Sequence, residues 1–318
     1  MRKFAMIGAA GYVAPRHMKA IEATGNTLAA ALDINDSVGI IDSYFPFAHF
    51  FTEFERFDRH VDRIRRNNPE DSVDFISICS PNYIHDSHIR FALRSDADAI
   101  CEKPLVLNPW NIDGLKNIEK DTGRKVNTIL QLRLHPAIVS LKNKVSREKL
   151  TRKYEVDLTY ITSRGKWYLQ SWKGDIKKSG GIATNIGVHF YDMLYFVFGN
   201  LETNIVHYAS ELKAVGNLEY ECARIRWFLS IDPEDIPEPL NREGKRTFRS
   251  IKVDGEEIEF SGGFTDLHTR SYEEIISGRG FGLEDNRVAI QTVSEIRNSL
   301  PIGLIGDCHP YLHSRKCK

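Results

Sequence analysis

The first 130 residues alternate short apolar runs with stretches that repeat apolar residues at helical spacing, and this alternation constrains the fold more than any other feature. It is typical of βαβ units, which build a parallel sheet covered by helices on both faces. The run Val73–Cys79 is nearly continuous, as expected for a strand buried on both faces. Four further runs are predicted as strands: Lys3–Ile7, Leu28–Leu32, Ala97–Cys101 and Val126–Gln131. Residues 1–130 are therefore predicted to form an α/β domain with a doubly wound parallel sheet.

The pattern changes after residue 150, where Tyr154–Thr162 alternates in hydropathy like a strand of a sheet covered on one face only. Four more strand-like runs follow, at 205–210, 224–230, 248–253 and 257–260. Asp254-Gly255 is a hairpin signal, and the charged, proline-rich stretch Asp232–Arg246 is expected to be a surface loop. Two helices, near 266–277 and 284–299, are expected at the domain junction. Residues 131–318 are thus predicted to be a second α/β domain with an open, mainly antiparallel sheet, which binds substrate and forms subunit contacts.

Length and composition limit the classes of protein to consider. The 318 residues exceed what one hydrophobic core usually serves, which agrees with two domains. The 43 basic and 43 acidic residues balance, which argues against nucleic acid or a membrane surface as partner. The five cysteines are odd in number and include no CxxC pair, so neither a disulfide framework nor a cysteine zinc site is expected. Without a signal peptide or a run of about 18 apolar residues, the protein is expected in the cytoplasm.

A glycine turn follows the first strand, with the spacing Gly8-x-x-Gly11-x-x-Ala14 instead of the usual GxGxxG. Such a turn lets backbone N–H groups approach a pyrophosphate at a helix N-terminus, although a glycine pair there is also common in ordinary turns. Asp33 ends the second strand, where a carboxylate accepts hydrogen bonds from ribose hydroxyls and repels a 2′-phosphate, which favours NAD over NADP. The predicted dinucleotide contacts in this part of the chain are Gly8, Ala10, Gly11, Tyr12, Val13, Asp33 and Asn35.

Two more segments follow predicted strands, and ligands of open α/β sheets bind at the carboxyl ends of strands. The first contains Ser80, Pro81, Asn82 and His85, which are predicted cofactor contacts, although turn and capping chemistry explains them equally well. The second is Glu102-Lys103-Pro104. A lysine beside bound nicotinamide is suited to holding a substrate hydroxyl, whereas a lone lysine is usually a solvated surface group.

In the segment Gly180–Asp192, the residues Asn185, His189 and Asp192 recur at i, i+4 and i+7, which places them on one face if the segment is helical. Histidine is the commonest general base, so His189 is a candidate, with a satisfied core histidine as the alternative. The spacing also suits a metal, but no third or fourth ligand is evident, and no metal site is predicted.

The glycine turn, Asp33, SPNYIH, CEKP and GGIATNIGVHFYD, in this order, resemble the Gfo/Idh/MocA oxidoreductases over nearly the whole chain. The resemblance implies an NAD-binding Rossmann domain, a second α/β domain with an open sheet, assembly as dimers or tetramers, and the catalytic pair Lys103 and His189. A closer resemblance, to the UDP-N-acetylglucosaminuronate 3-dehydrogenases of bacterial O-antigen synthesis, is carried by GAAGYVAPRHMKAI, DINDSVGIIDSYFP, KYEVDLTYITSRGKWYLQSWKGD and SGGIATNIGVHFYDML. These enzymes oxidise the sugar C3 hydroxyl to a ketone, and some relatives reoxidise NADH with 2-oxoglutarate. Asn185 stands where many members of the family carry aspartate.

The resemblance implies that one of Lys103 and His189 takes the hydroxyl proton as hydride leaves, while the other holds the hydroxyl. A substrate with a pyrophosphate and a carboxylate also needs cations. Four residues around Trp167 and Tyr168 are therefore predicted substrate contacts, with a solvated loop as the alternative: Arg164, Lys166, Trp172 and Lys173. Asn185 and His189 complete this set. Two other functions stay open: a dehydrogenase of a free sugar or inositol, and a dinucleotide-binding regulator without turnover.

Overall fold

The computed structural model describes residues 1–148, 152–259 and 266–314. The chain divides into two compact units, the first formed by residues 1–131 and 265–287 and the second by residues 132–264 and 288–318. Phe260, at the end of a predicted strand, and Cys317 lie outside the described residues. Within the described part, no helix combines the length and the apolar character that crossing a bilayer requires.

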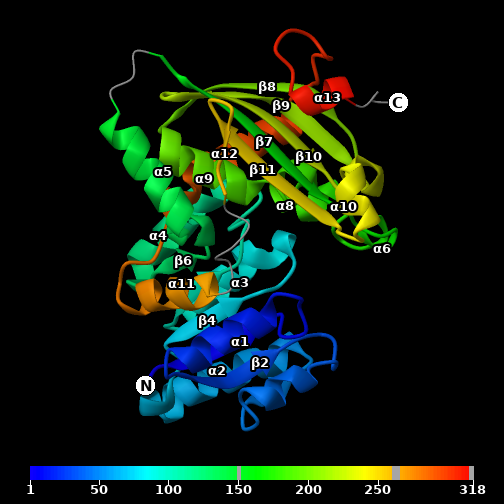
Figure 1. The fold of residues 1–318 in the computed structure, drawn as a ribbon. Coiled ribbons are helices and arrows are strands. Elements are labelled where there is room, and N and C mark those ends of the chain that lie inside the picture. The colour runs from blue at the N-terminus through cyan, green and yellow to red at the C-terminus, as the bar shows by residue number, and fades with distance from the viewer. Residues whose placement is uncertain (149–151, 260–265, 315–318) are drawn as a thin grey trace. The chain divides into compact units, whose positions relative to one another are not determined.

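The sheet of the first unit has six parallel strands in the order β3-β2-β1-β4-β5-β6 (Figure 1). Their bounds are β1 (Lys3–Ile7), β2 (Thr27–Leu32), β3 (His49–Phe51), β4 (Phe75–Ile78), β5 (Asp98–Cys101) and β6 (Val126–Thr128). The direction of winding reverses between β1 and β4, and this switch point is where doubly wound sheets bind ligands beyond their carboxyl ends. The predicted parallel α/β fold is confirmed.

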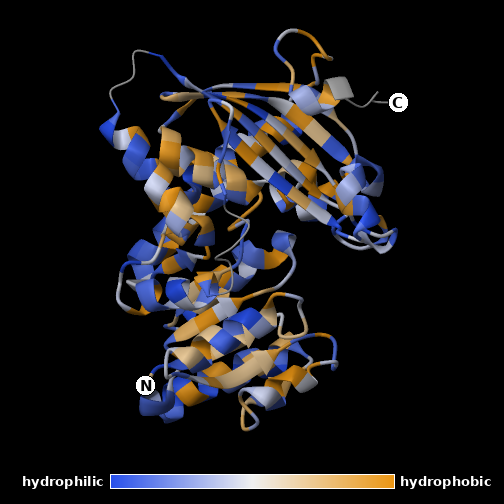
Figure 2. Ribbon diagram, viewed as in Figure 1, coloured by the Kyte–Doolittle hydropathy of each residue, from blue (hydrophilic) through white to orange (hydrophobic). Residues whose placement is uncertain are grey.

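Four helices connect the strands of this sheet: α1 (Ala14–Ala23), α2 (Phe54–Asn67), α3 (His85–Arg94) and α4 (Pro109–Thr122). Along α1, the predicted stripe Ala14, Met18 and Ile21 is fully buried. The helix α4 begins after Asn108 and ends at Gly123, whose left-handed conformation terminates it. Hydrophilic and hydrophobic residues alternate along these ribbons (Figure 2), as expected for helices with one face on a sheet.

A later helix, α11 (Leu267–Ile276), packs against α1 in the first unit. Its residues Tyr272 and Ile275 belong to the same hydrophobic cluster as Phe4 and Met18. The next helix, α12 (Leu283–Asn298), starts in the first unit and continues into the second. The two compact units therefore differ from the predicted division at a single boundary at residue 130, because residues 265–287 complete the core of the first unit.

The second unit has a mixed sheet in the order β12-β11-β7-β10-β9-β8, in which only β7 and β10 run parallel. The strands are β7 (Tyr154–Thr162), β8 (Leu201–Ala209), β9 (Lys213–Tyr220), β10 (Ala223–Ser230), β11 (Thr247–Val253) and β12 (Glu256–Glu257). This confirms the predicted, mainly antiparallel sheet. Asp254 and Gly255 both have positive φ in the tight turn from β11 to β12, as the hairpin signal predicts.

Helices pack on this sheet from both faces. On one side lie α8 (Gly181–Asn185), which contacts β9 and β10, and α9 (Val188–Phe198), which packs on α5 (Pro136–Arg147). On the other side Phe228 and Val215 form an apolar cluster with Cys308 and Leu312, the latter in α13 (Pro310–Ser314). The remaining α-helices are single turns: α6 (Trp167–Gln170), α7 (Ile176–Ser179) and α10 (Glu238–Arg242).

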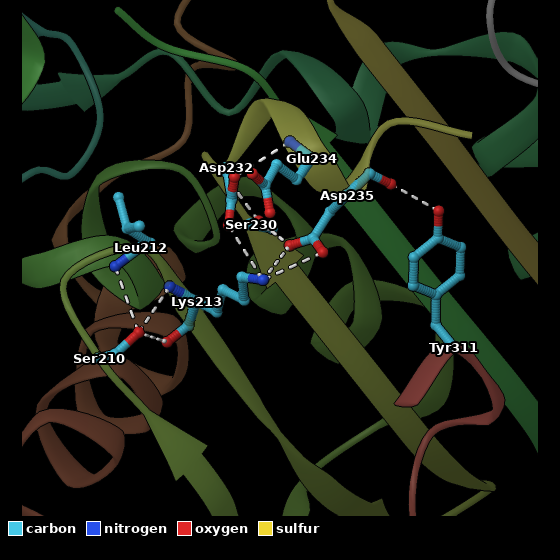
Figure 3. A network of polar contacts seen from close by, with 8 residues as sticks. All are labelled: Ser210, Leu212, Lys213, Ser230, Asp232, Glu234, Asp235 and Tyr311. Carbon is cyan, nitrogen blue, oxygen red and sulfur yellow. Dashed lines mark hydrogen bonds and ion pairs between the residues drawn. The ribbon is translucent and has the colours of Figure 1, made fainter. Parts of the chain in front are cut away.

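The expected surface loop 232–246 is partly wrong, because its first residues are tied to the sheet (Figure 3). Asp235 is buried and accepts a hydrogen bond from Ser230 at 2.6 Å. The ammonium group of Lys213 lies 3.0 Å from carboxylate oxygens of both Asp232 and Asp235. The hydroxyl of Tyr311 donates to the backbone oxygen of Asp235. These bonds satisfy a carboxylate that charge and proline content alone assign to solvent.

Candidate active site

The glycine turn lies directly against the end of β4. Gly8 has φ +89°, and a Cβ there would lie 2.6 Å from the backbone carbon of Cys79 and 2.7 Å from the nitrogen of Ser80. A Cβ at Gly11 would lie 3.0 Å from the Gly8 oxygen. Gly8 is therefore required by close backbone packing at the switch point between β1 and β4, and the space at Gly11 is tight for any Cβ.

Two backbone N–H groups of this turn, at the start of α1, are left for a ligand. Gly8, Ala9, Ala10, Gly11 and Ala14 donate to oxygens of the chain itself. In contrast, the N–H groups of Tyr12 and Val13 donate to no described residue, and the Tyr12 side chain is 90% exposed. Two unsatisfied donors at a helix N-terminus suit an anionic group such as a pyrophosphate. The turn therefore fits a dinucleotide.

Asp33 stands at the carboxyl end of β2 and holds the glycine turn. One carboxylate oxygen accepts from the Ala10 N–H at 2.9 Å, and the other accepts from the backbone and side chain of Asn35 at 2.9 and 3.3 Å. The neighbouring Ile34 is 86% exposed. The structure thus brings together the predicted turn, Asp33 and Asn35 at one sheet edge, where a carboxylate has further lone pairs to offer a ribose hydroxyl.

The segment after β4 is joined to the segment after β5 through His85. This side chain is 1% exposed, with Nδ1 2.8 Å from the Pro104 oxygen and Nε2 2.8 Å from the Ser80 oxygen. Burial lowers the pKa of His85, although both carbonyl contacts act in the opposite direction. His85 thus holds together the loop after β4 and the loop after β5. Asn82 is buried beside it in a short 3-10 helix, and the Ser80 hydroxyl contacts His88 Nδ1 at 2.9 Å.

Glu102 and Lys103 follow β5 at the same sheet edge. Lys103 is half-buried, whereas Glu102 is 7% exposed and accepts hydrogen bonds from the ring nitrogens of His17 and His268. Burial disfavours the ionised carboxyl, but the hydrogen bonds from the two histidines outweigh it and hold the pKa of Glu102 well below its usual range. A fixed anion therefore lies beside the predicted catalytic lysine.

The predicted helical face with Asn185, His189 and Asp192 is interrupted. Asn185 ends α8 and His189 lies in the first turn of α9, because the helices are broken at Ile186 and Gly187. A Cβ at Gly187 would lie 2.6 Å from Leu229 of β10, so the break lets the chain approach the sheet. His189 and Asn185 are half-buried, and Asp192 is 1% exposed.

Asp192 forms a buried ion pair with Arg133, which precedes α5. The guanidinium donates from Nη2 to Asp192 Oδ1 at 2.7 Å and from Nε to Oδ2 at 3.1 Å. Both side chains are at most 5% exposed. This pair fixes the first turns of α9, one turn from His189.

The cationic segment of the second unit, residues 164–173, interleaves basic residues with the aromatic residues Trp167, Tyr168 and Trp172. The Lys173 ammonium lies 4.4 Å from the ring centroid of Trp172 and 5.5 Å from that of Trp167. Burial and the charge of Arg164 lower the pKa of Lys173. Asn185 donates a short hydrogen bond to the buried Tyr168 hydroxyl, which connects this segment to α8. Arg164 and Lys166 are exposed. Lys173 therefore lies near Trp172 and Arg164, and Asn185 is joined to the same segment through Tyr168.

Sequence reasoning missed His17, His268 and Arg133. His17 has a visible signal, since it lies three residues after Ala14 on the buried stripe of α1, where a polar residue needs a partner. For His268 and Arg133, no pattern in the sequence indicates burial or partner. Their carboxylate partners come from residues far away in the chain.

Two family models match the chain. The oxidoreductase family with an NAD-binding Rossmann fold (Gfo/Idh/MocA) matches residues 2–129, and the C-terminal alpha/beta domain of the same family matches residues 142–236. Inositol 2-dehydrogenase from Rhizobium meliloti is 27% identical over 148 residues, which are 46% of this chain and 43% of that enzyme. D-glucoside 3-dehydrogenase from Escherichia coli is 28% identical over 40% of this chain and 36% of that enzyme. The chain thus matches less than half the length of these two relatives.

The WlbA (WbpB) dehydrogenase from Thermus thermophilus is similar over almost the full length. Its crystal structure with NAD and α-ketoglutarate has a TM-score of 0.94 and 50% sequence identity, and covers 98% of this chain and 100% of that one. Its crystal structure with NAD and UDP-GlcNAcA has a TM-score of 0.93 with the same identity and coverage. The chain therefore belongs to the Gfo/Idh/MocA oxidoreductase family, and its first domain is that family's NAD-binding Rossmann domain.

Proposed function

We propose that this protein is an NAD-dependent dehydrogenase that oxidises the C3 hydroxyl of UDP-N-acetylglucosaminuronic acid (UDP-GlcNAcA) to a ketone. The observation that carries the proposal is the 50% identity, over 98% of this chain, to a dehydrogenase crystallised with NAD and UDP-GlcNAcA. Position 3 is supported by D-glucoside 3-dehydrogenase and glucose-6-phosphate 3-dehydrogenase, two shorter matches that act at that position. The 3-keto product would serve the synthesis of 2,3-diacetamido uronic acid sugars of O-antigen lipopolysaccharide.

The cofactor is held by the first unit. The glycine turn and the N–H groups of Tyr12 and Val13 would bind the pyrophosphate, and Asp33 would bind the adenosine ribose. The segments after β4 and β5 complete the edge, with Ser80, Pro81, Asn82, Glu102 and Lys103 beside the cofactor and His85 supporting them. When bound, NAD accepts the hydride that leaves C3.

Lys103 and His189 are the proposed catalytic pair. His189 takes the proton of the C3 hydroxyl, while Lys103 holds that hydroxyl and polarises it. The same reaction results if the roles are exchanged, with Lys103 as the base and His189 holding the hydroxyl. The buried pair of Arg133 and Asp192 orients the helix that carries His189. Asn185 donates to Tyr168 and so joins α8 to the segment that carries Arg164 and Lys173.

The cationic segment would bind the anionic parts of the substrate. Arg164 suits bidentate contact with a phosphate or carboxylate, Lys166 and Lys173 add positive charge, and Trp172 offers a ring face for uracil. A neutral polyol such as inositol needs no such group, so these residues favour a nucleotide sugar acid. We expect the KM for UDP-GlcNAcA to rise at least about tenfold in Arg164→Ala, since a charged hydrogen bond is lost.

We further propose that α-ketoglutarate reoxidises bound NADH, because the similar Thermus thermophilus dehydrogenase was crystallised in complex with NAD and α-ketoglutarate. Nucleotide sugars and NAD are cytoplasmic, and the four cysteines in the described part of the chain are free thiols, which fits that compartment. Assembly as a dimer or tetramer follows from the family resemblance, and light scattering of the purified protein measures it.

The deciding experiment incubates the purified protein with UDP-GlcNAcA and follows absorbance at about 340 nm, where the reduced cofactor absorbs. We expect a rise with added NAD, and its reversal when α-ketoglutarate is added. Mass spectrometry should show a product lighter than the substrate by two hydrogens. Turnover with inositol or a free sugar, but not with UDP-GlcNAcA, would favour a different substrate, and bound NAD without turnover of any sugar would favour a regulator.

The catalytic pair is tested by Lys103→Ala and His189→Asn. Each should lower kcat by about 100-fold or more, because proton transfer in the transition state loses its partner. Lys120→Ala on α4 and His49→Asn on β3 are matched controls, since both residues are exposed. Near wild-type kcat in either of the first two variants would contradict the assignment.

A further inference from the structure

A buried chain of polar side chains runs through the first unit and ends at the catalytic lysine segment. It consists of Ser77 on β4, His17 on α1, His268 and Tyr272 on α11, and Glu102 after β5. All five side chains belong to residues at most 7% exposed. The proposed mechanism does not use His17, His268 or Tyr272.

The carboxylate of Glu102 is the centre of this chain. Its Oε1 lies 3.0 Å from Nε2 of His17 and 3.1 Å from Nε2 of His268. Its Oε2 accepts the backbone N–H of Lys103 at 3.2 Å. The backbone N–H of Glu102 itself donates to the Ile78 oxygen of β4 at 3.0 Å. Lys103 is therefore the first residue beyond the sheet, and its amide is held by a side chain.

The proton positions follow from what each atom is able to donate. An ionised carboxylate only accepts, so the Nε2 atoms of His17 and His268 both carry protons. Neutral His17 then accepts at Nδ1 from the Tyr272 hydroxyl, 2.8 Å away, and Tyr272 in turn accepts from Ser77 at 2.6 Å. Burial lowers the pKa of His17, despite the opposing effect of Glu102, which agrees with the neutral form. Each of these contacts then has a donor and an acceptor.

The Glu102 carboxylate is a buried charge, and its place needs a reason. Burying a carboxylate costs free energy that apolar packing of α11 on α1 would avoid. The charge lies within hydrogen-bonding distance of only two kinds of group among the described contacts: the two imidazoles and the Lys103 amide. The imidazoles come from elements that are otherwise packed by hydrophobic residues. What the arrangement adds to the fold is thus a fixed backbone at residues 102 and 103.

We propose that His17 and His268 are positioning residues, which orient the Glu102 carboxylate so that it fixes the backbone from which Lys103 reaches the substrate. This inference rests on the proposed function, in which Lys103 holds the C3 hydroxyl. Removal of one imidazole leaves Oε1 with a single donor, and the carboxylate turns away from the Lys103 amide. A displacement of the lysine by about 1 Å lowers turnover without removing any cofactor contact.

The test compares His268→Leu with His268→Gln, because the glutamine amide places an N–H group near the position of the lost Nε2. Ile275→Val is the matched control, since it reduces packing in the same helix without contacting Glu102. We expect kcat of His268→Leu to fall at least about tenfold, with the Kd for NAD within about twofold of wild type. His268→Gln should recover most of kcat. Equal kcat in the leucine variant, measured per folded molecule, would overturn the proposal.

A second readout does not depend on turnover. Hydrogen exchange of the Lys103 amide, followed by NMR, reports the bond to Glu102 directly. We expect faster exchange in His268→Leu and in His17→Leu, and wild-type exchange in Ile275→Val. Unchanged exchange in both leucine variants would disprove the positioning role even if the wild-type enzyme turned over another sugar. Conversely, absent turnover of UDP-GlcNAcA with accelerated exchange would reject the proposed function alone.

Glu102, His17 and His268 also present ligand-type atoms within 4.8 Å of one another, a set that suits a metal ion. In the proposed arrangement, the Nε2 atoms of His17 and His268 both carry protons, so they offer a metal ion no lone pair. We therefore expect the purified protein to contain no stoichiometric metal by mass spectrometry, and EDTA to leave kcat unchanged. A stoichiometric metal whose removal abolishes activity would overturn the positioning mechanism.

Discussion

At the scale of single residues, Asp33 performs two tasks with one carboxylate. It holds the Ala10 N–H of the glycine turn, and we propose that its charge discriminates between cofactors. Asp33→Asn keeps an acceptor for Ala10 but removes the charge. We therefore expect at least about tenfold less preference for NADH over NADPH in fluorescence titrations, because repulsion of the 2′-phosphate is lost. Asp36→Asn, an exposed acid in the same loop, should leave the preference intact. An unchanged preference in Asp33→Asn would place the ribose elsewhere.

His309 illustrates how a buried imidazole makes stability depend on pH. Its Nδ1 accepts from the Tyr311 N–H at 3.1 Å, and its Nε2 contacts the Thr159 hydroxyl at 3.2 Å. Burial and the charge of Arg226 lower the pKa of His309 to about 3. The folded state thus binds this proton less readily than the unfolded chain, so its stabilisation is complete above pH ~6.5 and is lost as the pH falls.

We expect the difference between pH 6.5 and pH 5 to be about 2 kcal/mol for this one group. Urea unfolding at both pH values measures it. His309→Gln should show a correspondingly shallower loss, whereas His49→Gln, at an exposed position, should follow wild type. Parallel pH profiles for wild type and His309→Gln would mean that other groups control the acid response.

At the scale of elements, the ion pair between Arg133 and Asp192 fastens α9 beside the proposed general base. Removing one partner from a buried pair leaves an uncompensated charge, so Asp192→Ala should lower the free energy of unfolding by about 3–5 kcal/mol. The double variant Arg133→Met/Asp192→Leu should lose less than Asp192→Ala. The exposed pair of Arg242 and Glu238 is the control, and its removal should cost at most about 0.5 kcal/mol. Denaturant unfolding distinguishes these cases, and a small loss in Asp192→Ala would contradict the pair's structural role.

Regular patterns in the sequence predict elements well, and close packing decides the exceptions. The alternation in Tyr154–Thr162 predicts β7 with its observed bounds. The pattern does not reveal β9, because Gly216 and Asn217 interrupt it. Gly216 is nevertheless required there, since a Cβ would lie 2.2 Å from the Ile205 oxygen of β8. Similarly, β6 ends at Thr128, earlier than predicted, because the chain turns into a 3-10 helix at Gln131. Such limits depend on neighbouring strands and are not visible locally.

The site follows the same division. Motifs next to strand ends predict which residues gather at the edge of the first sheet, because parallel topology fixes where those ends lie. The partners that hold them are not predictable, since His268 reaches Glu102 from α11, far along the chain. Asp33, Lys103 and His189 are thus proposed from local motifs and the family resemblance, whereas the bonds that surround them depend on the tertiary fold.

At the scale of the whole molecule, the first unit is formed by two segments that lie far apart in the sequence. Residues 265–287 rejoin residues 1–131, and α11 contributes Tyr272 to the same core as Phe4, with ring centroids 5.7 Å apart. Hydropathy gives no sign of this return, because α11 carries an ordinary amphipathic pattern that fits either unit. The consequence is that α11 shares its hydrophobic core with the dinucleotide-binding unit.

We expect NAD to slow hydrogen exchange in α11 as well as in β1, β4 and α1, because a ligand stabilises the whole unit that binds it. Exchange measured by mass spectrometry, with and without saturating NAD, tests this by peptide. The strands β9 and β10 serve as internal controls, since they belong to the sheet of the second unit. If α11 responded like β9 while β1 became protected, the segment that contains α11 would be energetically independent of the dinucleotide-binding unit. Glu102 would then lack the rigid support that we propose it receives from His268.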